Sequence, residues 1–128
     1  HDAARPCVKV SDVAKLIDYC LKNDEGGILA VPVSDTIKQQ NAAGKIGKTI
    51  PRDKLWAAQT PQCFKVGLLT KALSNTESVV TDEASAIEAL GLKPALIEGS
   101  SINFKVTRPA DLALARAVFK ARAAGEDI

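Results

Sequence analysis

A continuous run of apolar residues in the first third of the chain places the tightest constraint on the fold. Residues 28–33 read Ile-Leu-Ala-Val-Pro-Val, with no polar residue among them. A strand with one wet face alternates apolar and polar side chains, whereas an unbroken apolar run is typical of a strand covered on both faces in a parallel sheet. Pro32 cannot donate a ladder hydrogen bond and marks the end of this strand.

The segment before this strand has the periodicity of an amphipathic helix. Ser11 is a natural N-cap, and Asn23 and the following Gly26 and Gly27 stop the pattern. Between them, apolar residues recur at helical spacing, namely Val13, Leu16, Ile17, Cys20 and Leu21. A helix followed by a doubly covered strand indicates an α/β fold.

Two further helices are predicted after Pro61. Apolar residues mark them at Val66, Leu68, Leu69 and Leu73 for the first helix, and at Ala84, Ile87 and Leu90 for the second. Thr81 is the expected N-cap of the second helix, and Gly91 ends it. Asp82 and Glu83 complement the dipole of its first turn.

The tail of the chain is predicted to form one strand and a last helix. Residues 102–107 alternate, with Ile102, Phe104 and Val106 on one face and polar side chains on the other. Pro109 then begins a helix whose apolar residues are Leu112, Ala115 and Phe119.

Residues 34–54 differ from their surroundings. They are polar and punctuated by glycine, without helical periodicity. Such a segment is either a disordered loop or a hairpin arm that reaches a partner chain, and composition alone favours the loop.

Composition excludes several classes of function. The net charge is +2, with no basic run and one tryptophan, which argues against a nucleic-acid-binding protein. No apolar stretch is long enough to span a bilayer, so we expect a cytoplasmic protein without membrane contact. Three widely spaced cysteines, Cys7, Cys20 and Cys63, indicate reduced thiols. His1 is the single histidine, which argues against a histidine-based metal centre.

The first six residues form the most suggestive local motif. Asp2 and Arg5 flank two alanines ahead of a proline, a pattern that suits the end of a strand where a ligand binds. An Asp-Arg pair that steadies a turn explains the same residues. The chain of 128 residues lacks methionine and begins on His1, so we expect it to be one domain of a longer protein.

Other polar residues each have a functional and a structural interpretation. Asp35 and Thr36 follow the buried strand, where a ligand or a turn cap would place them. Three basic side chains could either bind a phosphate or be solvated surface charges, namely Lys105, and Lys48 and Arg52 in the polar segment. Thr81 could bind an anion at a helix N-terminus besides capping it.

Five ordered blocks together are far more specific than their parts. The chain resembles the C-terminal part of the 2-C-methyl-D-erythritol 4-phosphate cytidylyltransferase family. The blocks are HDAARP at residues 1–6, PVSDTIK at 32–38, LWAAQTPQ at 55–62, TDEASA at 81–86 and NFKVTRP at 103–109. The resemblance implies an α/β fold with a partial Rossmann-like, mostly parallel sheet, flanking helices and a protruding β-arm at residues 34–54.

The resemblance also implies a reaction. CTP and 2-C-methyl-D-erythritol 4-phosphate would give the cytidine diphosphate derivative and pyrophosphate, with Mg²⁺ helping to hold the triphosphate. The substrate phosphate is the nucleophile, and with a second pKa of about 6 it needs no protein base at neutral pH. Arginine, lysine and Mg²⁺ would then position and neutralise the two anions.

By position, the resemblance assigns roles to seven residues. Asp2 would approach the substrate hydroxyls, and Thr81 and Lys105 would hold the substrate phosphate in the same subunit. Arg5, Thr36 and Arg52 would come from the neighbouring subunit of a homodimer built through the arm. Arg52 and Lys105 would act as the catalytic pair, and Thr60 is a weaker candidate for substrate binding.

This chain departs from the pattern of that family in two respects, one small and one large. Phe104 stands where the family commonly has isoleucine, an apolar exchange that should leave Lys105 in place. The glycine-rich loop and the cytosine-binding segments of the family's N-terminal half are absent, so we expect this chain alone to be inactive. A ribitol 5-phosphate cytidylyltransferase and a non-catalytic dimerisation module are the alternative interpretations.

Overall fold

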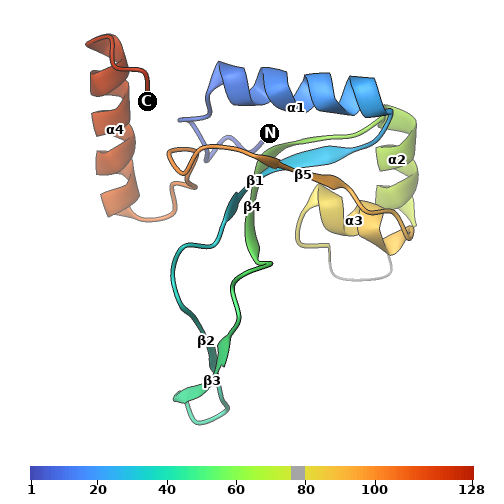
Figure 1. Ribbon diagram of the computed structural model, residues 1–128, viewed down its shortest axis with the longest axis horizontal. Helices are drawn as coiled ribbons and strands as arrows, with labels where there is room; N and C mark the ends of the chain where they lie inside the picture. Colours follow the sequence, from blue (N-terminus) through green and yellow to red (C-terminus); the bar gives the residue numbers. More distant parts are fainter. Residues whose placement is uncertain (76–79) are drawn as a thin grey trace.

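A three-stranded mixed sheet forms the centre of the molecule (Figure 1). The computed structural model describes residues 1–75 and 80–128. Strand β1 (Gly27–Pro32) lies in the middle, β5 (Ala95–Glu98) pairs with it in parallel, and β4 (Trp56–Cys63) pairs with it antiparallel. The expected doubly covered strand is therefore confirmed, and its last residue is Pro32.

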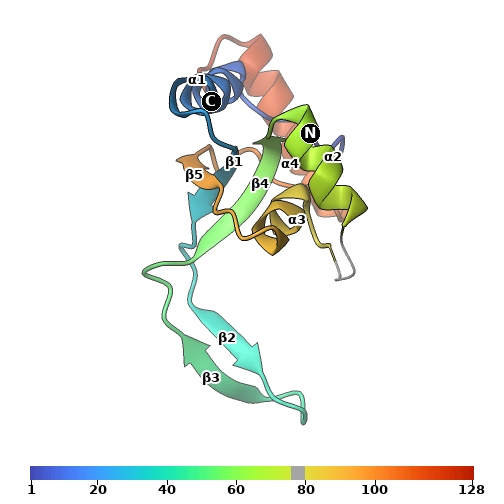
Figure 2. The ribbon, with the colours of Figure 1, turned by 90° about the vertical axis from the view of Figure 1, so that its right-hand side faces the viewer.

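Helices cover both faces of this sheet (Figure 2). Helix α1 (Val10–Asn23) packs on one face, where Leu16 meets Leu29 in a buried cluster. Helices α2 (Val66–Ser74) and α3 (Glu83–Ala89) lie on the other face. There Ala84 meets Ile28, the neighbour of Leu29 along β1. Ile28 and Leu29 are thus buried on opposite faces of the sheet, and burial extends over Gly27–Ala30, whereas Val31 is half-buried and Pro32 is exposed.

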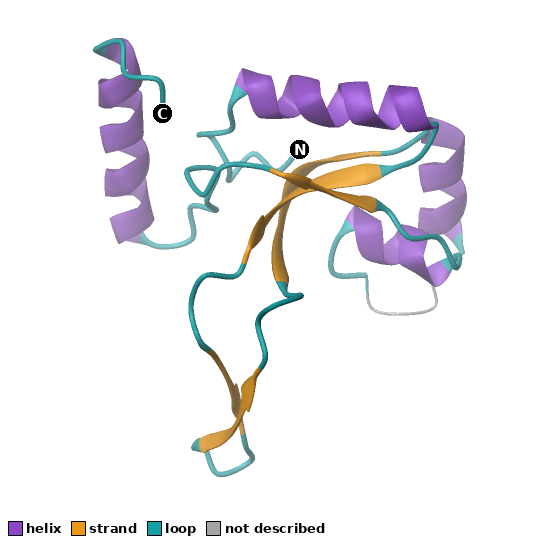
Figure 3. Cartoon of the chain, viewed as in Figure 1, coloured by secondary structure: helices purple, strands orange, loops and turns teal. Residues whose placement is uncertain are grey.

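A hairpin extends away from the sheet, as Figures 1 and 3 show. Its strands are β2 (Ile37–Gln40) and β3 (Ile46–Ile50), which pair antiparallel. At the tip, Gly44 has a φ of +76°, a conformation that favours glycine. Most of the hairpin's side chains are exposed. The arm implied by the resemblance is confirmed in shape, and the loop favoured by composition is wrong.

Helix α4 (Pro109–Ala123) is followed by the last five residues of the chain. It lies at one side of the molecule, away from α2 and α3 (Figure 1). It begins at Pro109, as predicted. The Asp111 carboxylate accepts the backbone N–H groups of Thr107 and Arg108, the two residues that immediately precede this helix. The α/β class with flanking helices and a protruding β-arm is confirmed.

Both predicted N-caps are wrong. Helix α1 already begins at Val10, because the N–H groups of Asp12 and Val13 bond to the carbonyl of Lys9. In α3 the cap is Asp82, whose carboxylate accepts the N–H of Ser85. The Ser85 hydroxyl in turn bonds the Asp82 backbone, so a capping box one residue later outcompetes Thr81.

The predicted strand at 102–107 is also wrong, and β5 was missed. Residues 102–107 follow a turn closed by the Asn103 N–H on the Ser100 carbonyl, and no strand forms there. Asn103, expected on the polar face of that strand, is fully buried. Its side chain bonds to β4, so side-chain contacts rather than a ladder hold this segment.

Two compositional expectations can be compared with the structure. Cys7, Cys20 and Cys63 are free cysteines, in line with reduced thiols. Burial, and then the neighbouring Cys63, raise the pKa of the Cys20 thiol to about 11.

Over the part of the chain that the structure describes, no helix is long and apolar enough to cross a membrane.

Candidate active site

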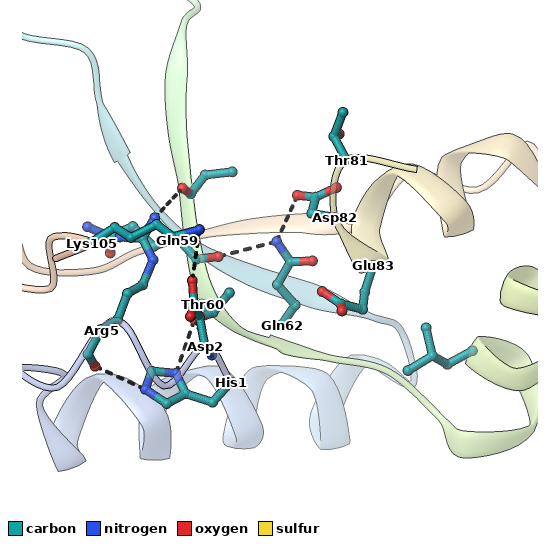
Figure 4. Close-up of a pocket in the computed structure, with 12 residues that line it drawn as sticks. His1, Asp2, Arg5, Gln59, Thr60, Gln62, Thr81, Asp82, Glu83 and Lys105 are labelled. Atoms are coloured by element: carbon teal, nitrogen blue, oxygen red, sulfur yellow. Dashed lines mark hydrogen bonds and ion pairs between the residues drawn. The ribbon is translucent and has the colours of Figure 1, made fainter. Parts of the chain in front are cut away.

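A pocket of about 670 Å³ opens where the start of the chain, strand β4 and the N-terminus of α3 meet (Figure 4). Polar and charged side chains dominate its wall. The lining residues are His1, Asp2, Arg5, Ala58, Gln59, Thr60, Gln62, Leu69, Thr81, Asp82, Glu83 and Lys105.

Asp2 is held at the pocket by its own backbone and by β4. Its N–H donates to the Thr60 Oγ1 at 2.9 Å, and its Oδ1 accepts the Ala4 N–H at 2.9 Å. The turn closes when the Arg5 N–H donates to the Asp2 carbonyl at 3.0 Å. The two alanines allow this tight turn, which aims the Asp2 carboxylate at the pocket.

Lys105 forms an ion pair with this carboxylate across the pocket. Its Nζ lies 3.2 Å from Asp2 Oδ2. The Ala4 N–H first, and then Lys105, lower the pKa of Asp2 below its ordinary value of 3.8. Asp2 is therefore ionised at neutral pH and its charge is partly balanced by Lys105.

We expect the Asp2 carboxyl to titrate below pH 3.8 in the folded protein. Because its pKa is lowered, the ion pair is fully formed above the ordinary value and is lost as the pH falls through the lowered pKa. In a Lys105→Met variant the midpoint should rise only part of the way, since the Ala4 N–H contributes the larger effect. NMR titration of ¹³C-labelled aspartate carboxyls measures both midpoints, and a wild-type midpoint at 3.8 or above would contradict the geometry.

Arg5 supplies a second positive charge to the same pocket. Its Nη1 donates to the Asn103 carbonyl at 2.6 Å, and its Nη2 donates to the Ala58 carbonyl at 3.3 Å. Partial burial lowers the pKa of Arg5 below its ordinary value, yet an arginine stays protonated at neutral pH in proteins. Two cations, Arg5 and Lys105, therefore line the same pocket as the carboxylates of Asp2, Asp82 and Glu83.

Thr60 and His1 form a short chain of hydrogen bonds at the pocket floor. The Thr60 Oγ1 lies 3.1 Å from His1 Nδ1, and His1 Nε2 lies 3.1 Å from the Arg5 carbonyl. Because that carbonyl can only accept, Nε2 donates to it. The Thr60 Oγ1 also accepts the Asp2 N–H, so it links His1 to the backbone of Asp2.

The far wall is the first turn of α3, tied to β4 by one glutamine. Gln62 Nε2 donates to Asp82 Oδ2 at 2.9 Å, and its Oε1 accepts the Ala84 N–H at 2.9 Å. Thr81 precedes this turn and lines the pocket. The glutamine thus fixes the position of Thr81 relative to the Asp2 side of the pocket.

Five of the seven residues singled out from the sequence line this pocket: Asp2, Arg5, Thr60, Thr81 and Lys105. Thr36 and Arg52 do not line it, and both lie at the base of the arm, where Arg52 Nη1 bonds the Ser34 carbonyl. Arg5 was expected to come from a second subunit, but it lines the pocket of its own chain because its backbone closes the Asp2 turn.

Sequence reasoning missed several lining residues, chiefly His1, Gln59, Gln62 and Asp82. Gln59 and Gln62 lie within the LWAAQTPQ block. Two amide side chains in a strand that crosses the core were the signal that could have found them.

The arrangement suits a phosphorylated ligand that carries hydroxyl groups. Lys105 and Arg5 can neutralise phosphate oxygens, and the Asp2 carboxylate can accept hydrogen bonds from hydroxyls. Thr81 adds a neutral hydroxyl group at the wall. Within residues 1–75 and 80–128, no group of three or more His, Cys, Asp or Glu side chains could hold a metal ion.

Comparison with known proteins identifies many relatives of one kind. The family model described as "IspD: 2-C-methyl-D-erythritol 4-phosphate cytidylyltransferase" matches residues 1–121. The enzyme of that name from Chromobacterium violaceum is 53% identical over 123 residues, which are 95% of this chain and 55% of the relative. The one from Dechloromonas aromatica is 55% identical over 122 residues, or 95% of this chain and 53% of the relative.

Solved structures agree in fold. A 4-diphosphocytidyl-2C-methyl-D-erythritol synthase superposes with a TM-score of 0.85 at 48% identity, covering 93% of this chain and 54% of that one. The cytidylyltransferase of Francisella tularensis gives a TM-score of 0.83 at 40% identity, covering 92% and 57%. The chain thus spans about half the length of the curated relatives that it matches.

Proposed function

The chain belongs to the 2-C-methyl-D-erythritol 4-phosphate cytidylyltransferase family, and we propose that it is the C-terminal part of an enzyme that transfers CMP from CTP to 2-C-methyl-D-erythritol 4-phosphate. The products would be 4-diphosphocytidyl-2-C-methyl-D-erythritol and pyrophosphate, in non-mevalonate isoprenoid biosynthesis. The observation that carries the proposal is the pocket in which Asp2, Arg5 and Lys105 converge.

The proposed step is a phosphate attack on CTP. An oxygen of the substrate phosphate forms a bond to the α-phosphorus, and the bond from that phosphorus to the bridging oxygen breaks. The electron pair leaves on pyrophosphate. A dianionic phosphate monoester is already deprotonated, which agrees with a pocket whose one histidine is held in a hydrogen-bond chain.

This chain's residues would position the attacking phosphate. Lys105 Nζ and the Arg5 guanidinium offset the repulsion between two anions, and Thr81 donates from the α3 side. Asp2 accepts hydrogen bonds from substrate hydroxyls, and its pairing with Lys105 keeps that lysine at the pocket mouth before the substrate binds.

The arm would complete the site across a homodimer. Thr36 and Arg52 lie outside their own chain's pocket, at the base of a hairpin that extends away from the sheet. In a symmetric dimer each arm would reach the other subunit, and Arg52 would join Lys105 at the substrate phosphate. We place the assembled enzyme in the cytoplasm.

Mg²⁺ is expected to accompany the CTP phosphates, as it does for many nucleotide substrates. The Asp2 carboxylate already accepts the Ala4 N–H and pairs with Lys105, and Asp82 is committed to its helix cap. The pocket of this chain therefore does not fit a resident Mg²⁺ site. The ion enters the proposal only with the nucleotide.

The test uses the whole protein that carries this chain. With CTP and 2-C-methyl-D-erythritol 4-phosphate it should release pyrophosphate, whereas ribitol 5-phosphate should be a far poorer acceptor. Residues 1–128 alone should show no turnover, because the relatives are about twice as long. Pyrophosphate release with ribitol 5-phosphate and not with the methylerythritol substrate, or dimerisation without turnover of either, would contradict the proposed function.

A further inference from the structure

Two buried amide side chains lie directly behind the cations of the pocket. Asn103 is fully buried, and Gln59 is 4% exposed. Asn103 Nδ2 donates to the Thr60 carbonyl at 2.8 Å and to Gln59 Oε1 at 3.3 Å. Gln59 Nε2 donates in return to the Ser100 carbonyl at 3.0 Å. The two amides therefore clamp the segment after β5 onto β4.

The contacts of Asn103 and Gln59 determine the positions of the two pocket cations, Arg5 and Lys105. Lys105 lies two residues beyond Asn103 on the same irregular segment, which no strand ladder holds. The Asn103 carbonyl itself accepts the Arg5 Nη1 at 2.6 Å. Gln59, Arg5 and Lys105 all line the pocket shown in Figure 4. A shift of Asn103 would therefore move Lys105 and release Arg5 together.

Packing alone does not account for an asparagine here. Among the residues that the structure describes, Asn103 Oδ1 and Arg5 Nε are buried and have no hydrogen-bond partner. A buried polar atom without a partner is unfavourable, and an apolar side chain would avoid that penalty. There is also little free space beside the Gln59 amide, because a Cβ atom at Gly99 would lie only 2.9 Å from Gln59 Oε1. Asn103 thus holds two acceptors through Nδ2, while its Oδ1 stays without a partner among the described residues.

We propose that Asn103 is a positioning residue that fixes the separation of Arg5 and Lys105 at the substrate phosphate, with Gln59 as its partner. The inference rests on the proposed function, since it assigns the two cations to one phosphate. Asn103 does not touch the substrate and acts only through the segment and the carbonyl that it holds.

The experiment uses the whole protein with an Asn103→Asp substitution. This side chain has nearly the same shape, but it presents an oxygen to the Thr60 carbonyl and to Gln59 Oε1. We expect kcat/KM for 2-C-methyl-D-erythritol 4-phosphate to fall about 10- to 100-fold, while the KM for CTP changes less than about twofold. Gln59→Glu, which breaks the other half of the clamp, should give the same pattern and replaces Asn103→Asp if that variant does not fold.

Leu16→Ala is the matched control for lost stability. Leu16 is as deeply buried, but it lies on α1, packs against Leu29 and does not line the pocket. It should lower the melting temperature and leave both KM values and kcat within about twofold at a temperature where each variant is folded. Kinetic constants of Asn103→Asp that match those of Leu16→Ala would overturn the proposal.

A double-mutant cycle separates positioning from a general structural role. The loss caused by Asn103→Asp should shrink when Lys105→Ala or Arg5→Ala is already present, because there is one cation fewer to misplace. Full additivity in both backgrounds would also overturn the inference. If the wild-type protein releases no pyrophosphate at all, the proposed function fails first, and this result is distinct from a variant that behaves like wild type.

Discussion

Replacing Lys105 with methionine is expected to slow pyrophosphate release by about 100- to 1,000-fold in the whole protein. Methionine keeps the length of the side chain and removes the ammonium group that lies 3.2 Å from Asp2. Without it, the attacking phosphate meets the CTP phosphates with less neutralising charge, and the Asp2 carboxylate adds repulsion. Steady-state kinetics with both substrates would measure the loss as a fall in kcat together with a rise in KM for the phosphorylated acceptor.

Lys65→Met is the matched control for this variant. Lys65 also pairs with an aspartate, Asp24, at 2.6 Å, but the pair lies on the surface outside the pocket. Its loss should leave turnover within about twofold, because exposed ion pairs contribute little. A Lys105→Met protein that retains wild-type turnover would remove Lys105 from the site.

The fold was predictable where the signal is local. The apolar run at residues 28–33 predicted a strand with both faces packed against other elements. Helix α1 packs on one face of that strand and α3 on the other. Strand β5 was missed because Ala95–Glu98 is four residues long and mixes apolar and charged side chains. Its place in the sheet comes from pairing with β1, a partner almost 70 residues away, which periodicity alone cannot indicate.

The site was predictable as a set of residues but not as a geometry. Asp2 and Lys105 meet because the Asp2 N–H bonds to Thr60 on β4, and the Val106 N–H bonds to the Ala4 carbonyl and so joins the tail to the start of the chain. Asn103 was placed on the polar face of an expected strand because alternation groups it with Lys105 and Thr107. Its partners lie 43 and 44 residues away, so only the tertiary structure shows that the amide is buried.

Arg52 offers the sharpest test of the arm. Arg52→Ala in the whole protein should lower turnover about 100-fold, since the side chain would meet the substrate phosphate of the other subunit. Its own pocket does not include it, so the loss cannot come from a direct contact there. Turnover and the dimer fraction, the latter by analytical ultracentrifugation, should be measured together, and turnover at the wild-type level would contradict a role for Arg52.

Mixed dimers then decide whether Arg52 and Lys105 act across subunits. In a dimer of one Arg52→Ala subunit and one Lys105→Met subunit, one of the two sites would keep both side chains. Statistical mixing should therefore restore about a quarter of the wild-type activity. The matched control pairs a wild-type subunit with one that carries both substitutions, and there each site would lack one side chain. After statistical mixing, this control should retain about a quarter of the wild-type activity, all of it from wild-type homodimers. About half of the wild-type activity in the control and none in the first mixture would place both residues in a single subunit, and the arm would then have no part in the site.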